Sequence, residues 1–244
     1  MTQERALNRA IEELINSIVS KIRNMDVNEF LRIGVDPFRF SINVGFYGER
    51  KSIKKEVEHK LAMNLENYVG NFHEKYLGNC EHVPTQTMWQ EVNRGQIPGI
   101  DIMNRKLKKY YQVKSKHNSM NSSSSAKLAQ ELHDLTEKDG DAEVGCAWIV
   151  AKKDKKCIGE KVISNTGYVL KGKDAYSYIT GDSDELDEVI DALPERINDK
   201  IKNTNIDVES IIEDAAEKIY KELRQRANSE GLSIVQYLKN ESID

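Results

Sequence analysis

The chain of 244 residues is poor in cysteine and proline and has no long apolar run. Its three cysteines, Cys80, Cys146 and Cys157, are widely spaced and form no Cys-x-x-Cys pair, which argues against a disulfide framework or a zinc knuckle. No apolar stretch approaches the roughly 20 residues that a membrane-spanning helix needs. The N-terminal residues lead into a polar-interrupted helical pattern instead of a secretory signal, so we expect a cytoplasmic protein.

The chain also lacks the excess of positive charge that is common in nucleic-acid-binding proteins, since its net charge is −4. The charge is unevenly distributed, however. Residues 101–127 carry seven lysines and arginines against one aspartate, whereas residues 182–244 carry 17 acidic against eight basic residues. A basic segment in an acidic protein suits an enzyme that binds an anion locally, although a solvated loop with several lysines gives the same pattern.

Apolar residues recur at helical spacing in two stretches of the N-terminal part. Residues 3–24 and residues 51–77 both show this periodicity, which predicts two amphipathic helices. Gly78 is typical of the end of a helix. Residues 36–48 contain an Asp-Pro pair and two glycines, so we expect turns there.

The middle of the chain changes to a strand pattern. Ile97, Ile100 and Ile102, followed by residues 110–114, predict two short strands joined through a basic turn at residues 104–109, as in an antiparallel hairpin. Four serines at 122–125 are N-cap candidates for a helix that runs to about residue 138. Further strands are expected at residues 144–151, 168–170 and 176–180.

Helices return in the C-terminal part, at residues 186–197 and 211–223, and Pro194 is expected to kink or divide the first of these. Strands in the middle with helices on both sides imply an α/β fold, with a mixed central β-sheet flanked by helices and a helical C-terminal region. We expect one domain over residues 1–244. Its parts would be a helical part at 1–80, a core at about 81–182 and an acidic helical part at about 183–244.

The residues that carry chemistry form two short motifs, Pro98-Gly99-Ile100-Asp101 and Gln112-Val113-Lys114. On a strand, residues two apart share a face, so Gln112 and Lys114 point the same way while Val113 faces the core. Asp101 joins that face if the preceding strand pairs beside this one. A carboxylate, an amide oxygen and an ammonium group then converge at one sheet edge, as metal-assisted phosphodiester hydrolysis requires. Aspartate and lysine are common residues, so this spacing alone also arises by chance.

The two motifs resemble the signature of the PD-(D/E)xK nuclease superfamily. The next residues are more specific: Lys114-Ser115-Lys116-His117-Asn118-Ser119-Met120-Asn121-Ser122-Ser123-Ser124 resembles the block after the catalytic lysine in type II restriction endonucleases that cleave GGNCC and GGWCC sites. The close resemblance covers about residues 98–131, and weaker echoes lie at residues 70–74 and 172–181. It implies a restriction-endonuclease-like fold and Mg²⁺-dependent cleavage of DNA.

The resemblance implies that Asp101 is a metal ligand, Gln112 a second ligand and Lys114 the catalytic lysine. The superfamily usually has Glu or Asp where this chain has Gln112. A neutral amide oxygen holds Mg²⁺ less strongly than a carboxylate, which puts a two-metal site in doubt. Another acid would compensate, and the helix at residues 51–77 offers three candidates: Glu58, Glu66 and Glu74. Glu74 lies in the echo at residues 70–74, although a solvated helix glutamate explains it equally well.

Basic and polar residues near the motifs are candidates for DNA contacts. They are Arg94, Lys116, His117, Asn118, Asn121 and Ser122. The basic side chains suit phosphate, whereas asparagine and serine side chains bond to phosphate or to base edges. Simpler explanations are a turn histidine bonded to backbone at 117, a structural Asn118, and serines that only cap a helix.

Taken as a whole, the resemblance implies a type II restriction endonuclease that hydrolyses double-stranded DNA at a short GC-rich site. The single domain would then be a nuclease domain, with its catalytic core at about residues 81–182. Symmetric cutting implies a homodimer, and the resemblance implies a cognate DNA methyltransferase as functional partner. Two alternatives stay open: a repair or structure-selective nuclease of the same fold, and a non-catalytic DNA-binding module in which the motif is accidental.

Overall fold

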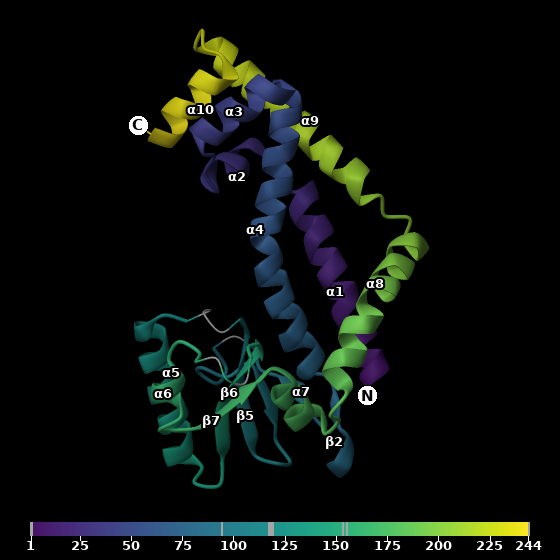
Figure 1. Cartoon of the computed structure of the whole chain (residues 1–244), viewed down its shortest axis with the longest axis vertical. Helices are drawn as coiled ribbons and strands as arrows, with labels where there is room; N and C mark the ends of the chain where they lie inside the picture. The colour runs from purple at the N-terminus through teal and green to yellow at the C-terminus, as the bar shows by residue number, and fades with distance from the viewer. Residues whose placement is uncertain (1, 94, 117–119, 153, 155, 244) are drawn as a thin grey trace. The chain divides into compact units, whose positions relative to one another are not determined.

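Figure 1 shows the computed structural model of the chain, which describes residues 2–93, 95–116, 120–152, 154 and 156–243. Contacts divide the chain into two compact units. We call Met1–Leu14 with Asn67–Lys200 the sheet unit, and Ile15–Glu66 with Ile201–Asp244 the helical unit. The expected single nuclease domain, with its part boundaries near residues 80 and 182, stays a prediction.

The helices are α1 (Gln3–Arg23), α2 (Val27–Arg32), α3 (Pro37–Tyr47), α4 (Glu49–Leu77), α5 (Ser122–Lys138), α6 (Glu160–Ile163), α7 (Gly172–Thr180), α8 (Glu185–Asn203), α9 (Val208–Ser229) and α10 (Ile234–Ile243), with a 3-10 helix at Val83–Thr85. The strands are β1 (Glu81–His82), β2 (Thr87–Met88), β3 (Gln90–Glu91), β4 (Ile102–Asn104), β5 (Lys109–Lys116), β6 (Glu143–Val150) and β7 (Tyr168–Lys171). The five helices predicted from apolar periodicity are present as α1, α4, α5, α8 and α9, and α4 ends one residue before Gly78.

The helical unit is built on one apolar core, to which α2, α3, α9, α10 and the first part of α4 contribute. Phe30, Phe40, Ile53 and Leu223 have no exposed surface in this core. Burial of each such side chain contributes about 1.5–3 kcal/mol to stability. Apolar packing among these helices therefore contributes much of the stability of the unit.

Helix α3 shows that the expectation of turns in residues 36–48 is wrong. Asp36 caps this helix, because its side chain accepts hydrogen bonds from the first-turn N–H groups, including that of Phe38 at 2.9 Å. Pro37 takes the first helical position, where its missing N–H costs nothing and its fixed φ favours the helix. Gly48, with φ of 79°, follows the last residue of α3. The expected turn residues thus mark the two ends of a helix.

The sheet unit contains a five-stranded sheet in the order β3-β4-β5-β6-β7. Strands β3, β4 and β5 are antiparallel, whereas β5, β6 and β7 are parallel. The predicted hairpin is formed by β4 and β5, with Ile102 opposite Tyr111. The predicted fold class, a mixed central sheet flanked by helices with a helical C-terminal region, is confirmed.

The two faces of the sheet carry different residues. Lys114 of β5 lies opposite Trp148 of β6, and Trp148 belongs to an apolar core that α5 and α6 share with this face. Tyr111 points to the other face, where its ring contacts that of Tyr178 from α7. Figure 1 shows α5 and α6 on one side of the sheet and α7 on the other. The side chains of Gln112 and Lys114 therefore lie on the face that α5 covers.

Both tryptophans are core residues of the sheet unit, with Trp89 1% and Trp148 0% exposed. The indole N–H of Trp89 donates to the carbonyl oxygen of Ile179 at 2.7 Å. The contact ties the segment before β3 to α7. Trp148 stands in the middle of the core beneath α5 and α6.

One further expectation is wrong, and another is wrong in part. Residues 176–180 belong to α7, because the side chains of Tyr176, Ile179 and Thr180 are buried together at helical spacing. Pro194 lies inside α8 and does not divide it, and a kink at this proline stays a prediction. The residue four positions earlier, Ile190, is 54% exposed, so solvent can satisfy the carbonyl that the proline leaves without a donor.

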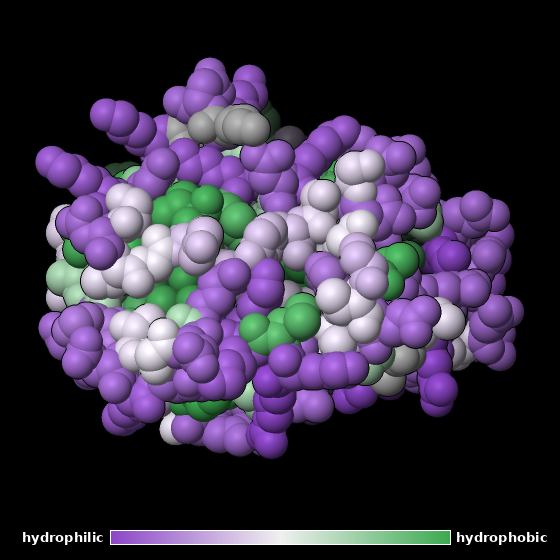
Figure 2. Space-filling model, turned by 90° about the horizontal axis from the view of Figure 1, so that it is seen from below, coloured by the Kyte–Doolittle hydropathy of each residue, from purple (hydrophilic) through white to green (hydrophobic). Residues whose placement is uncertain are grey.

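One face of the protein shows how polar and apolar residues are distributed on its surface. Figure 2 shows a face on which hydrophilic atoms dominate and hydrophobic atoms form small patches. None of the helices in the described ranges is both long enough and apolar enough to span a bilayer.

Candidate active site

Asp101 lies at a bend directly before β4, and backbone bonds fix it between two strands. Its N–H donates to the carbonyl of Tyr111 at 3.0 Å, and its carbonyl accepts from the N–H of Val92 at 2.8 Å. Asp101 is therefore bonded on both sides, to β5 and to the residue after β3. Its position follows from the hairpin register and not from a flexible loop.

The side chain of Asp101 meets the other two motif residues. Its Oδ2 accepts the backbone N–H of Val113 at 2.8 Å and the side-chain amide Nε2 of Gln112. The ammonium Nζ of Lys114 lies 4.0 Å from the same oxygen. These bonds to described residues all use Oδ2, which leaves Oδ1 as the oxygen for a ligand. The structure thus brings Asp101, Gln112 and Lys114 together.

Gly99 allows the chain to turn tightly before Asp101. Its φ is 72°, a conformation that costs L-residues energy. A Cβ atom at this position would lie 2.7 Å from Oε2 of Glu131 and 2.8 Å from Cδ1 of Leu128, both on α5. The positive φ and the close approach to α5 together favour glycine at position 99.

The three motif residues line a cleft of about 890 Å³ in the sheet unit. The lining comes from the end of α4, the segment around residues 91–101, the second half of β5, and α5. Of the three glutamates considered as compensating acids, Glu74 lines this cleft, whereas Glu58 and Glu66 do not. The remaining charged lining residues are Lys75, Glu91, Lys127 and Glu131.

Glu74 has an unusual electrostatic environment in this cleft. Burial, and then the negative charge of Asp101, raise the pKa of its carboxyl to about 7, although Lys114 acts in the opposite direction. The negative charges of Asp101 and Glu74 thus repel each other within one cleft. A bound cation would relieve this competition, because it stabilises both carboxylates at once.

The oxygen atoms offered here suit a hard divalent cation. Asp101 and Glu74 supply carboxylate oxygens, and Gln112, whose Nε2 is engaged with Asp101, retains Oε1 as its ligand atom. Among the described residues, no group of three or more histidine, cysteine, aspartate or glutamate side chains is placed to hold a metal. Asp101, Glu74 and Gln112 are the candidate ligands that the cleft offers, two carboxylates and one amide.

Buried polar contacts fix α4 beside α7 and α8. His73 Nδ1 and the hydroxyl of Tyr176 are 2.8 Å apart, and the hydroxyl of Tyr76 donates to Glu185. Burial lowers the pKa of His73 to about 4, so its ring is neutral near pH 7. These contacts set the rotation of α4 about its axis. They hold residues 73 and 76 against α7 and α8 while Glu74 lines the cleft.

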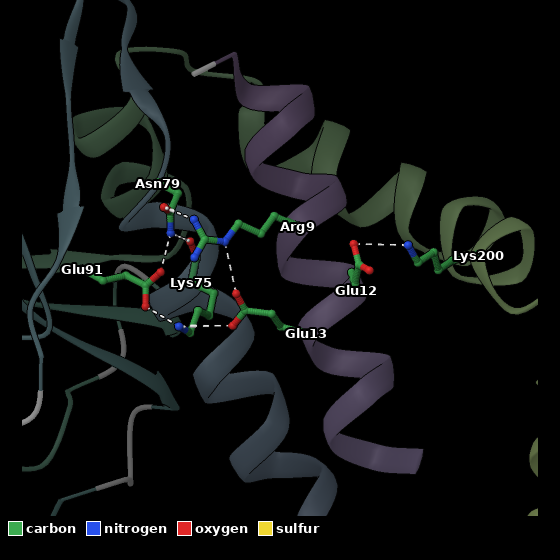
Figure 3. A network of polar contacts seen from close by, with 7 residues as sticks. All are labelled: Arg9, Glu12, Glu13, Lys75, Asn79, Glu91 and Lys200. Carbon is green, nitrogen blue, oxygen red and sulfur yellow. Dashed lines mark hydrogen bonds and ion pairs between the residues drawn. The ribbon is translucent and has the colours of Figure 1, made fainter. Parts of the chain in front are cut away.

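Figure 3 shows a polar network that holds Lys75 and Glu91 at one wall of the cleft. Lys75 pairs with Glu91 at 2.5 Å and with Glu13 of α1 at 3.1 Å. Asn79 donates to Glu91 at 2.5 Å, and Arg9 donates to Asn79 at 3.2 Å. Burial opposes the charge on Lys75, but its bonds to the two glutamates raise its pKa above the usual value. The network thus anchors the wall that α4 and β3 form.

The residues proposed for DNA contact lie partly outside the described part of the chain. Arg94, His117 and Asn118 are not among the described residues. Lys116 is partly buried at the end of β5, in register with Val150 of β6. The exposed residues Asn121 and Ser122 lie at the start of α5.

Asn121, and not a serine, caps α5. Its Oδ1 accepts the N–H of Ser124 at 2.8 Å. The expectation that Ser122–Ser125 supply the N-cap is therefore wrong by one residue. Ser122 occupies the first helical position and is exposed, whereas Ser125 is fully buried.

The sequence motifs did not reveal four charged residues of the cleft. Lys75 and Glu91 come from the end of α4 and from the two-residue strand β3. Lys127 and Glu131 follow the motif block on α5, where they pair at 3.6 Å. The spacing of four residues on a predicted helix was the available signal for this last pair.

Comparison with known proteins gives consistent matches. The model of the Eco47II restriction endonuclease family matches residues 1–202. The type II restriction enzyme Sau96I of Staphylococcus aureus is 22% identical over 208 residues, which cover 79% of this chain and 77% of that enzyme. The type II restriction enzyme Eco47II of Escherichia coli is 25% identical over 179 residues, which cover 67% of this chain and 72% of that enzyme.

Proposed function

The chain belongs to the Eco47II restriction endonuclease family and is a site-specific deoxyribonuclease that acts on double-stranded DNA, and we propose that it uses Mg²⁺ to cut both strands at a short GC-rich site. The observation that carries this proposal is the convergence of Asp101, Gln112 and Lys114 on one cleft of the sheet unit. Membership of a family of restriction endonucleases argues against the alternative of a non-catalytic DNA-binding module.

The proposed cation site consists of Asp101, Glu74 and the amide oxygen of Gln112. Bound there, Mg²⁺ would offset the charge of the scissile phosphate and lower the pKa of a water molecule. The Val113 N–H and the Gln112 amide fix Oδ2 of Asp101, so the carboxylate keeps one orientation. A fixed carboxylate loses little entropy when a ligand binds.

Lys114 is the proposed catalytic lysine. Its ammonium group lies 4.0 Å from Asp101 Oδ2, on the same face of β5 as Gln112. From this position it can orient an attacking water or stabilise the negative charge that develops at phosphorus. Pairing of β5 with β6, in which Lys114 lies opposite Trp148, holds its backbone in place.

DNA contacts are proposed for the residues around the cleft and at the start of α5. Lys116 and the N-terminal end of α5, with Asn121 and Ser122, offer a cation and polar groups for phosphate. Arg94, His117 and Asn118 remain candidates from the sequence. The GC-rich site, a homodimer and a cognate DNA methyltransferase are proposed from the resemblance to enzymes of this type.

Plasmid cleavage tests the proposal directly. The protein, plasmid DNA of known sequence and Mg²⁺ should give discrete fragments, whose mapped ends define the site. Lys114→Ala should lower the cleavage rate about a thousandfold without a change in melting temperature. Lys138→Ala, an exposed lysine at the end of α5 that does not line the cleft, is the matched control and should cut normally.

Two outcomes would contradict the proposal. Double-strand cleavage at the wild-type rate by Lys114→Ala would show that Lys114 is not the catalytic lysine. A continuous smear of products in place of fragments would favour a structure-selective nuclease of the same fold.

A further inference from the structure

Helix α3 of the helical unit has two apolar sides, and one of them faces outward. Phe40 on the inner side is fully buried in the core of the unit. Phe38, Ile42 and Phe46 are 76%, 61% and 78% exposed. Their spacing of four residues places these three side chains in one row along the helix. We call Phe38, Ile42 and Phe46 the α3 stripe.

The α3 stripe carries no charge. Arg39 is the sole charged residue in Pro37–Tyr47, a range that the structure describes in full, and its guanidinium pairs with Glu56 at 2.8 Å. The exposed residues Ser41 and Gly45 stand between the members of the stripe. A Cβ atom on Gly45 would meet nothing within 4 Å. Small residues among large apolar ones allow a second helix to approach closely.

The area of this surface matches what a dimer needs. With Tyr47, which is 49% exposed, the stripe presents roughly 500 Å² of surface, because an aromatic side chain covers roughly 150–250 Å². A stable interface buries about 800 Å² on each partner, of which about 65% is apolar in homodimers. The Lys55 ammonium lies 4.3 Å from the centroid of the Tyr47 ring and supplies the polar rim of such a patch.

We infer that the α3 stripe is the surface through which two copies of this chain form a two-fold dimer. The inference rests on the proposed function, because a two-fold dimer presents one active site to each strand of a near-palindromic site. At a two-fold axis each patch meets itself, so an uncharged apolar patch suits this contact without like-charge repulsion. DNA is a poor occupant, because the stripe offers no cation to phosphate.

The mass of the protein in solution tests this inference. Sedimentation velocity across the micromolar range should show a dimer for the wild-type chain. Ile42→Glu places a carboxylate in the centre of the stripe and should weaken the dimer by at least about 30-fold. The matched control is Ile190→Glu, on α8 of the sheet unit, where the wild-type residue is similarly exposed at 54%. This variant should stay dimeric.

Three results would overturn the inference: a monomeric wild-type chain, a dimer of Ile42→Glu with the wild-type dissociation constant, or equal dissociation of Ile190→Glu. Circular dichroism verifies that both variants are folded, and Phe46→Ser provides a second variant if Ile42→Glu is not. The measurement needs neither DNA nor metal. Lys114→Ala should remain dimeric, so a failure of the proposed chemistry and a failure of the proposed interface are separable.

Discussion

Helix α4 carries an inward-facing glutamate in each unit, and the two have opposite surroundings. In the helical unit, Glu56 is 1% exposed and accepts hydrogen bonds from Nε and Nη2 of Arg39 at 2.9 and 2.8 Å. In the sheet unit, Glu74 lines the cleft with Asp101, where burial and the neighbouring carboxylate raise its pKa to about 7. Glu56 is paired with Arg39, whereas none of the described residues forms an ion pair with Glu74.

The difference distinguishes a carboxylate that stabilises the fold, Glu56, from a carboxylate that is available to a ligand, Glu74. A buried carboxylate bound by arginine is tolerated in the folded state, and removal of the arginine lowers the free energy of unfolding. A carboxylate crowded by another carboxylate reduces stability, and such arrangements are typical of functional sites. Four substitutions test this contrast.

Asp101→Asn should give the largest effect. Asparagine keeps an oxygen for the Val113 N–H but removes the charge from the cleft, so we expect the cleavage rate to fall about a thousandfold or more. The melting temperature should stay the same or rise, because Glu74 loses its like-charged neighbour. Single-turnover plasmid cleavage and thermal melting measure the two quantities. Cleavage at the wild-type rate by Asp101→Asn would show that Asp101 is not a metal ligand.

Arg39→Ala should give the largest loss of stability. It leaves Glu56 buried without its partner, which should lower the free energy of unfolding by about 3 kcal/mol. Urea denaturation measures this change. Arg32→Ala is the control, because Arg32 is 71% exposed and its partner Glu29 retains Lys21. If both variants lose equal stability, the Glu56 pair has no special role.

Gln112→Glu should strengthen the binding of Mg²⁺ about tenfold, since a carboxylate holds the ion more firmly than an amide. It should also lower the melting temperature without metal, because a further negative charge enters the cleft beside Asp101. Melting curves over a range of Mg²⁺ concentrations report both effects. An unchanged metal dependence would exclude Gln112 from the ligand set.

Glu74→Gln should stabilise the metal-free protein at pH 8 on the order of 1 kcal/mol. A raised pKa means that the folded state disfavours the charged glutamate. This cost is absent below the unfolded pKa near 4.5, grows as pH rises, and is complete above about 7. The gain from glutamine should therefore appear in urea titrations at pH 8 and vanish near pH 4. A gain that is equal at both values would contradict the pKa assignment.

The sequence predicted the parts of the fold that local pattern dictates. Helices α1, α4 and α5 have long apolar periodicity, and β6 is a continuous apolar run. Helix α3 was missed because Pro37 and Gly48 are signals both of turns and of helix ends. Strands β1, β2 and β3 have two residues each, so only their tertiary partners define them.

The candidate site likewise has residues that local sequence pattern predicted and residues that it did not. The meeting of Asp101, Gln112 and Lys114 follows from pairing of adjacent strands, so residue spacing together with the predicted hairpin anticipated it. Lys75 and Glu91 reach the cleft from α4 and β3. Their place depends on packing with α1, through contacts such as that between Lys75 and Glu13. Such contacts between distant segments leave no local pattern in a single sequence.

The positions of Trp89 and Trp148 give only the sheet unit a tryptophan fluorescence signal. Both indoles are buried in the sheet unit, and the sequence has no third tryptophan. Tryptophan emission, excited at the red edge where tyrosine does not absorb, will therefore follow the melting of the sheet unit, while the helical unit contributes to far-ultraviolet dichroism without a tryptophan signal. Superimposed denaturation curves from the two probes would mean that the units unfold as one, and separated curves would give each unit its own stability.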